Sequence, residues 1–511
     1  DKSHQKRLLE PLTDPSSSPE RKQSQAAAKR MRWMPFAVGS AAIFAILVYW
    51  FAVGRLAQDA PLTAIAVLPL EDQSPTDHQY LADGLTSSLR DDLNRIPSLT
   101  ISGRTSTRRV SATDASLEAL GEALGVGSIV EGSVQVVGDD LKVVAEWTRV
   151  RDGAQLWSAR YEREIQDIND VPVVQNEIAK AIAEAIRLEL GISEALLSNI
   201  LEGRYEPTDV RAWQLMLECT SLIYRFSMEG FEEAERLCQR AIKIDPNYAQ
   251  AYGQLAIVHW LRADSDEPSG NTALAERTAK KAIELNPNSV GGNWVLAHLS
   301  MRQWHLSAAD ERLEHAIRVR PSVPFLALAR VVLRWRQGKL DEALTEARRA
   351  VSLEPMWVSA QSHLGLTHLA LGDHKAALTA LEHALTLGGM TQSAKVALAF
   401  AYEMSGQSDK AIEAMLIALP NFEEVIRLGY EANGWKGIGH ALAEAAPIES
   451  CPAEFHALAG ELDEMYECLE IDLLRRATVL PEILHASPAF MPYRREARFQ
   501  DLIARVSAQI R

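Results

Sequence analysis

The sequence has little cysteine, no excess of positive charge and only one long apolar run. Four cysteines occur in 511 residues, with no CxxC pair and no Cys/His spacing typical of zinc binding, which argues against a metal-binding module. The 53 Lys and Arg face 68 Asp and Glu, and the net charge of -15 argues against nonspecific binding to nucleic acid. The remaining composition, 47% hydrophobic and 24% charged, is ordinary for a folded chain of two or three domains.

The four cysteines form two pairs that are close in sequence. In an oxidising compartment, Cys219 with Cys238 and Cys451 with Cys468 predict two local disulfides. Cysteine also packs well as a small buried hydrophobe. We favour buried thiols and keep the two disulfides as the alternative.

The one long apolar run predicts a transmembrane helix over residues 33–54. It contains no charge across 22 residues and would be about 33 Å long as a helix, enough to span a bilayer. Basic residues precede it and only Arg55 follows closely, so we expect a single-pass protein of the bacterial inner membrane with residues 55–511 in the periplasm. A cleaved signal peptide and a buried core helix are the alternatives.

The segment before this run, residues 1–32, is a basic linker that we expect in the cytoplasm. It carries eight Lys and Arg against four acids, a net charge of +4, which leaves -19 for the rest of the chain. Its Ser, Pro, Gln and Lys content and its lack of apolar periodicity predict no packed structure. The sequence starts with Asp rather than Met, so we expect further sequence upstream.

Residues 61–192 predict a small α/β domain. Short apolar or alternating runs predict strands, and leucines at steps of four predict a first helix. The expected strands are residues 64–70, 99–102, 128–137, 141–150 and 155–164, and the expected helices are residues 79–95, 116–124 and 173–190.

The same region resembles the TolB-amino-terminal-like domain in the phrases IAVLPLEDQS, YLADGLTSSL, GVGSIVEGSVQ and GAQLWSARYERE. The resemblance implies a three-layer α/β fold that often lies between a membrane span and tetratricopeptide repeats, and no catalytic residues. Asp83 and Glu131 resemble an acid/base pair, but their positions at a helix entry and within a strand favour structural roles. No nucleotide-binding glycine motif is present, and we expect no cofactor.

Residues 205–422 predict about six tetratricopeptide-type helix pairs. Alanines recur in two registers with steps of 41, 34, 34, 34 and 34 residues, and 34 is the period of this repeat. Small residues allow the close helix approach that repeat packing needs, and a Pro follows the first four repeats where the second helix must stop. We attribute the longer step to a polar loop near residues 264–271. The repeat-packing residues are Ala234, Ala275, Ala309, Ala343, Ala377 and Ala411 in one register and Ala241, Ala282, Ala316, Ala350, Ala384 and Ala418 in the other.

The repeat array predicts a concave face that binds proteins or peptides. Six tryptophans are candidates for this groove, although core packing is the more usual role: Trp213, Trp260, Trp294, Trp304, Trp335 and Trp357. Seven histidines between residues 298 and 383 raise the idea of a pH sensor. Residues 423–511 predict a C-terminal helical cap.

The predicted fold is mixed: one transmembrane helix, a small three-layer α/β domain and an all-α tetratricopeptide-repeat superhelix. This order resembles membrane-anchored bacterial regulators of the winged-helix or adenylate cyclase type, neither of whose output domains precedes Trp33 here. We therefore predict a non-enzymatic, periplasmic sensory and protein-interaction module of a signalling or transcriptional regulator. The alternatives are a free-standing scaffold for envelope assemblies and the non-catalytic C-terminal part of an adenylate cyclase. Expected partners are proteins or peptides, with homo-oligomerisation left open.

Overall fold

The computed structural model of the chain divides into two compact units, Asp1–Asp59 and Ala60–Arg511, and only the second contains residues whose structure is described. The predicted cytoplasmic linker and membrane helix, residues 1–32 and 33–54, lie outside the described residues. The described residues are 60–75, 79–96, 98–113, 115–138, 140–164, scattered residues between 177 and 189, 209–223, 228–265, 270–446 and 451–510.

The predicted localisation requires correction. Within the described ranges, no helix combines the length and the apolar character that a bilayer crossing needs. Most repeat helices have 11 to 17 residues and the longest helix, α20, carries charged residues along its length, because these helices bury one face against protein and expose the other. A single-pass inner-membrane protein with residues 55–511 in the periplasm is therefore not supported.

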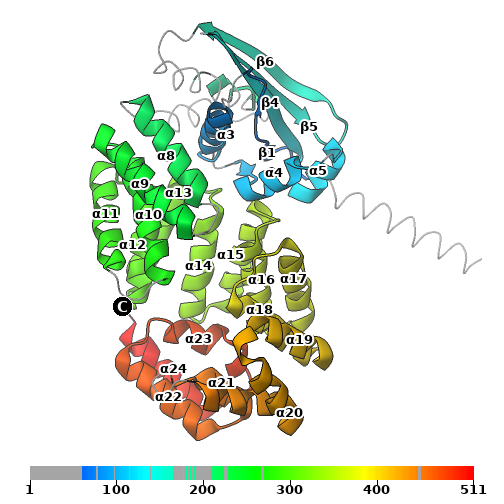
Figure 1. Cartoon of the computed structure of the whole chain (residues 1–511), viewed down its shortest axis with the longest axis vertical. Helices are drawn as coiled ribbons and strands as arrows, with labels where there is room; N and C mark the ends of the chain where they lie inside the picture. Colours follow the sequence, from blue (N-terminus) through cyan, green and yellow to red (C-terminus); the bar gives the residue numbers. More distant parts are fainter. Residues whose placement is uncertain are drawn as a thin grey trace, which may run out of the picture. The chain divides into compact units, whose positions relative to one another are not determined.

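The N-terminal part of the described chain is a mixed sheet with helices on both faces (Figure 1). The strand order is β3-β1-β4-β5-β6, with β2 paired to β4. Strand β1 pairs in parallel with β3 and β4, and β2 pairs in parallel with β4, whereas β5 pairs in antiparallel fashion with β4 and β6. The elements are β1 (Ala64–Val67), β2 (Glu71–Asp72), α3 (Gln79–Leu93), β3 (Thr100–Ile101), α4 (Arg104–Ser111), α5 (Leu117–Leu124), β4 (Ser128–Val137), β5 (Asp140–Arg149) and β6 (Gln155–Glu164).

Two buried clusters lie on opposite faces of this sheet. Because successive strand side chains point to opposite faces, Ile65 and Val67 of β1 join the cluster under α3, whereas Ala66 joins the cluster under α4 and α5. The helix α3 contributes leucines at steps of four to its cluster, as the sequence predicted. The predicted three-layer arrangement is therefore present in this part of the chain.

The helix α4 was not predicted from the sequence. Its eight residues, RTSTRRVS, contain one apolar side chain, Val110, so no apolar periodicity marks it. Its N-cap is Gly103, which has no side chain to accept the first backbone N–H groups. The stabilising partner comes from the repeats, as described below.

Six helix pairs follow in the described part of the chain between residues 209 and 418, and they stack in sequence order (Figure 1). Each first helix packs against its own second helix and against the first helix of the next pair, which is the packing of a helical-repeat superhelix. The pairs are α8 (Val210–Ile223) with α9 (Met228–Ile244), α10 (Ala249–Ser265) with α11 (Asn271–Leu285), α12 (Val290–Arg302) with α13 (Leu306–Val319), α14 (Pro324–Arg336) with α15 (Leu340–Leu353), α16 (Val358–Ala370) with α17 (His374–Leu387), and α18 (Gln392–Met404) with α19 (Ser408–Ala418).

The twelve periodic alanines all lie on the second helices of these pairs. Each is buried, and eleven of the twelve have no exposed surface. A larger side chain at these positions would push apart helices that are in direct contact. Part of the extra length in the 41-residue step is helical, because α10 has 17 residues where α12, α14 and α16 have 13. The predicted loop near residues 264–271 falls at the connection of α10 with α11 and lies partly outside the described residues.

The turn between the two helices of a pair requires a left-handed residue. Gly338, Gly372 and Gly406 occupy this position with φ angles of 71°, 82° and 74°. Trp304 occupies the same position one repeat earlier with φ 62°, a conformation that costs a non-glycine residue about 1 kcal/mol or more. Burial compensates for this cost: Trp304 is 1% exposed, and the guanidinium of Arg476 lies 5.3 Å from its ring centroid.

The C-terminal helices return along the repeats instead of only covering the last pair. Helix α23 packs against α14 and α16 (Figure 1). The buried guanidinium of Arg336 on α14 donates to the carbonyl oxygens of Met301 and Thr478, at 2.9 and 3.0 Å, and pairs with Glu482 of α23 at 3.1 Å. The elements are η2 (Pro420–Phe422), α20 (Glu423–Ala445), α21 (Ala453–Ala459), α22 (Leu462–Arg475), α23 (Leu480–Ala486), η3 (Pro488–Phe490) and α24 (Ala497–Gln509).

The α/β domain docks on the repeats through the N-terminus of α4. The buried carboxylate of Glu354, which follows α15, accepts hydrogen bonds from the backbone N–H groups of Thr105 at 3.0 Å and Ser106 at 2.8 Å. Gly103 leaves the space for this carboxylate, because a Cβ there would lie 2.0 Å from a Glu354 oxygen. Burial raises the pKa of the Glu354 carboxyl, and the hydrogen bonds from Ser106 and Thr105 oppose that rise.

Three further contacts extend this docking interface. Ser322 donates its hydroxyl to the carbonyl oxygen of Leu99 at 3.1 Å, and Arg320 pairs with Asp91 of α3 at 3.2 Å. Gly84 of α3 faces the ring of Trp213 on α8, where a Cβ would approach within 2.6 Å. The α/β domain therefore contacts the first pair and the middle pairs of the repeats together.

We expect Glu354→Ala to loosen this interface. The variant removes the acceptor of two buried N–H groups, so amide exchange at Thr105 and Ser106 should accelerate about tenfold or more and the free energy of unfolding should fall by about 1–2 kcal/mol. Hydrogen–deuterium exchange and urea denaturation measure both effects. The control Glu284→Ala removes a carboxylate that is 69% exposed and should change neither. Unchanged exchange at α4 in the Glu354 variant would contradict the capping role.

Candidate functional site

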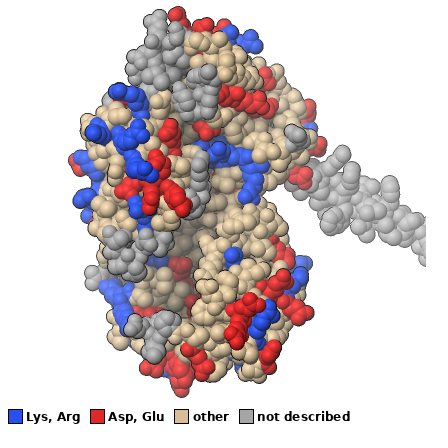
Figure 2. All heavy atoms as spheres, viewed as in Figure 1, with Lys and Arg blue, Asp and Glu red and all other residues tan. Residues whose placement is uncertain are grey.

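A cavity of about 630 Å³ lies between the first helices of the repeats and the α/β domain. Helices α8, α10, α12, α14 and α16 form one side, and α3 with the start of α4 forms the other. Its size is within the range of ordinary ligand sites. Lys and Arg side chains gather over α4 beside a hollow in the middle of the face drawn in Figure 2.

The repeat side of the cavity is mainly apolar and aromatic. Helix α10 lines it with Gly253, Gln254, Ile257 and Leu261, which follow one another at steps of one, three and four positions, so one face of the helix is turned inward. Aromatic rings continue this wall on the next helices. They are Trp294 on α12, Phe325 on α14, with ring centroids 5.7 Å from Trp294, and Trp357 before α16.

The polar groups of the wall include side-chain amides and arginines. Gln250 and Gln254 of α10 line the cavity, and their amides have no hydrogen-bond partner among the residues that the structure describes. Arg104 comes from α4, while Arg318 and Arg320 come from the end of α13. Both domains therefore supply cationic donors to one cavity.

Two histidines in the cavity wall are held neutral. His298 lies between Trp260 and Trp294, with ring centroids at 5.3 and 4.3 Å, and burial lowers its pKa to about 3. His363 stacks on Trp335 at 5.3 Å, and burial lowers its pKa as well. Neither imidazole changes its charge in the folded protein near neutral pH, so these two do not sense pH as the sequence pattern suggested.

These lowered pKa values still make folding depend on pH. The unfolded His298 takes up a proton below about pH 6.5, whereas the folded protein does so only near pH 3, so its contribution is complete above pH 6.5 and is lost as the pH falls. We expect the free energy of unfolding to drop between pH 7 and pH 5, and His298→Gln to reduce that drop by about 1–2 kcal/mol. Urea denaturation at both pH values measures it. His383→Gln, at an exposed position, is the control, and an equal drop in both variants would refute the expectation.

The six tryptophans considered for the groove divide into two groups. Trp294 and Trp357 line the cavity. The other four have the core-packing role that the sequence favoured: Trp213 packs against α3, and Trp260, Trp304 and Trp335 are buried. The amide and arginine donors of the cavity were not predicted. Gln250 and Gln254 are four residues apart on a first helix, a spacing that places both amides on the same helix face and could have indicated them.

The two carboxylates considered in the sequence lie apart from this cavity. Asp83 pairs with Arg104 at 3.8 Å. Glu131 lies on β4 opposite Glu146, and burial raises its pKa, with a further rise from Glu146 and Glu71. No group of three or more His, Cys, Asp or Glu positioned for a metal occurs within the described ranges.

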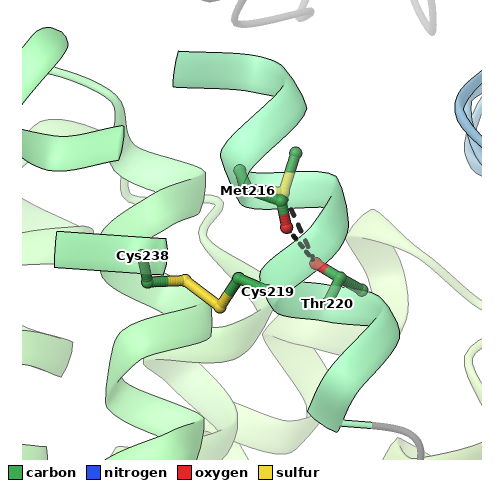
Figure 3. Close-up of a disulfide and its surroundings, with 4 residues drawn as sticks. All are labelled: Met216, Cys219, Thr220 and Cys238. Carbon is green, nitrogen blue, oxygen red and sulfur yellow. Dashed lines mark hydrogen bonds between the residues drawn. A yellow bond between two sulfur atoms is a disulfide. The ribbon is translucent and has the colours of Figure 1, made fainter. Parts of the chain in front are cut away.

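The cysteines of the first pair stabilise a cavity wall. Cys219 of α8 forms a disulfide with Cys238 of α9, and Figure 3 shows Cys219 directed toward α9 while Thr220 points away from it. The hydroxyl of Thr220 donates to the carbonyl oxygen of Met216 at 2.9 Å, and both residues line the cavity. The second pair, Cys451 with Cys468, is also joined by a disulfide, so the structure places disulfides where we had favoured thiols.

We expect the Cys219–Cys238 bridge to stabilise the first pair. A sequence separation of 19 residues corresponds to about 3 kcal/mol of loop-closure stabilisation. The double variant Cys219→Ala with Cys238→Ala should lose about 2–3 kcal/mol of unfolding free energy, measured by urea denaturation without reductant. Dithiothreitol should lower the stability of the unmodified protein by more than that of the variant, because the variant keeps only the Cys451–Cys468 bridge. Equal responses to dithiothreitol would contradict the prediction.

Residues 326–390 and 363–426 match a family model described as tetratricopeptide repeat, which covers helices α14 to α19. The chain thus contains tetratricopeptide repeats. A curated protein of Rhizobium meliloti (strain 1021) named "Putative adenylate cyclase 3" is 28% identical over 242 residues, 46% of this chain. The chain spans about two fifths of that relative, since the match covers 39% of its length.

Several solved structures share part of the arrangement. PilW, a type IV pilus biogenesis factor, has 15% identity, covers 41% of this chain and 93% of its own, and gives a TM-score of 0.32. YrrB, described as a TPR protein with an unusual peptide-binding site, has 17% identity, with 36% and 92% coverage and a TM-score of 0.28. The human IFIT1 dimer with m7Gppp-AAAA has 15% identity, with 66% and 87% coverage and a TM-score of 0.38.

Proposed function

We propose that this chain is a non-catalytic protein-interaction module of a signalling protein, in which the repeats bind a peptide segment of a partner. The observation that carries the proposal is the cavity of about 630 Å³ on the inner side of the first helices. Helical-repeat surfaces of this kind bind extended or helical segments, and apolar walls with a few polar groups suit such ligands.

The signalling role is supported by the position of the α/β domain. Residues of α3 and α4 line the same cavity as the repeats, so a bound segment would contact both domains. A ligand that binds the docked arrangement better than an undocked one shifts the population toward docking. The α/β domain would thereby report whether the repeats are occupied. We assign this domain to the TolB-amino-terminal-like type on the phrases quoted above.

The similarity to the Rhizobium meliloti protein favours one context for this signalling role. We propose that the chain corresponds to a non-catalytic, interaction-bearing part of an adenylate cyclase type of protein. A transcriptional regulator of the winged-helix type and a free-standing scaffold are the competing contexts, and no observation on the described residues favours either of them.

Selection of peptides from a displayed random library on the full chain tests the binding role. Gln254→Trp should fill the cavity from a half-buried position without removing a core side chain, so it should weaken the selected peptides about tenfold or more. The matched variant Gln239→Trp places the same side chain on the exposed face of α9 and should leave binding within twofold. If no peptide is enriched, or if both variants bind equally, the cavity is not the binding site.

A further inference from the structure

We infer that the segment bound in this cavity carries an apolar anchor side chain next to one or more carboxylates. This inference rests on the proposed function, because it names the ligand class of the same cavity. Three properties of the wall support it: its carboxylates are already engaged, its arginines retain hydrogen-bond donors, and its floor is apolar.

The two carboxylates among the described lining residues are both occupied. Asp91 pairs with Arg320 at 3.2 Å across the docking interface. Glu354 accepts the two N–H groups at the start of α4 and is 4% exposed. A Lys or Arg side chain of a partner would therefore enter the cavity without a carboxylate to pair with, which is costly for a charge removed from water.

The arginines can bind an anion in addition to their present partners. Each guanidinium has five N–H donors, and one carboxylate uses at most two of them. Arg318 is 62% exposed, and its pair with Glu314 at 3.0 Å is a solvent-exposed ion pair that contributes little. Arg104 of α4, which pairs with Asp83, and Arg320 after α13, which pairs with Asp91, place two more guanidinium groups on the two sides of the cavity. A carboxylate at this position would contact both domains.

The apolar residues and the glutamine amides of the cavity wall indicate the other features of the ligand. Phe325, Leu328 and Trp294 present apolar surface that water solvates poorly, so a Phe or Leu side chain gains by covering it. The amides of Gln250 and Gln254 each offer a donor and an acceptor, which matches the N–H and C=O groups of an extended backbone. The preferred ligand is therefore a peptide and not a small inorganic anion.

Three synthetic heptapeptides, blocked at both ends and labelled with fluorescein, test this assignment by fluorescence anisotropy on the full chain. The first has a central Phe flanked by Glu on both sides, the second replaces Glu with Lys, and the third replaces Phe with Ser. The first peptide should bind at least tenfold more tightly than either of the others. Arg318→Glu should weaken the first peptide about tenfold, corresponding to loss of one charge-assisted contact.

A matched variant controls for charge alone. Arg236→Glu reverses an arginine that is 69% exposed and paired with Glu233 on its own helix, as Arg318 is with Glu314, but it lies outside the cavity. It should change the affinity by less than twofold, and circular dichroism should show both variants folded. Equal binding of the Lys peptide, or equal loss in both variants, would overturn the anionic partner. If the library selects basic peptides that Gln254→Trp weakens, the anionic ligand class is wrong but the binding function stands. If Gln254→Trp weakens no peptide, the proposed binding function of the cavity is wrong.

Discussion

The arrangement of this protein depends on one carboxylate at the start of a helix that cannot cap itself. Glu354 supplies the acceptor that Gly103 lacks, and the hydrogen bonds join segments 249 residues apart in the chain. Aligned peptide dipoles make a helix N-terminus partially positive, so a buried carboxylate is well placed there. The glycine is equally necessary, because any side chain would occupy the position of the carboxylate. This contact holds the α/β domain against the repeats, and the cavity lies between them.

The repeats were predictable because their constraints are local and recur. A small residue is required at each close helix approach and a breaker after each second helix, so the alanine and proline spacing records the architecture directly. The strand positions were also readable, from the alternation of apolar and polar residues on either side of the β4–β5 turn. The helix α4 and the cavity were not, because Arg104–Ser111 has a single apolar residue and its cap lies in another domain. The left-handed conformation of Trp304 was not predicted for a similar reason: Arg476 lies against its ring, and no local pattern connects the two residues.

The Cys219–Cys238 disulfide and the neutral His298 both stabilise the repeat side of the cavity. Cys219 fixes α8 to α9 on the side that faces away from the cavity, while Met216 and Thr220 of the same helix face into it. His298 fills the space between two indole rings without carrying charge. Both features keep the wall preformed, and a preformed wall loses little conformational entropy when a ligand binds.

The return of the C-terminal helices changes the mechanics of the array. An ordinary solenoid is elastic, since each repeat touches only its neighbours and small rotations accumulate along it. Here Arg336 links α12, α14 and α23 through buried hydrogen bonds, and α23 also rests on α16, so it acts as a strut across successive pairs. Bending between these pairs would break the contacts of Arg336 and α23, so the curvature from α12 to α16 is fixed before any partner binds. The strut does not reach α8, α9 and α10, where the Cys219–Cys238 disulfide and the contact of Gly84 with Trp213 hold the first pair instead.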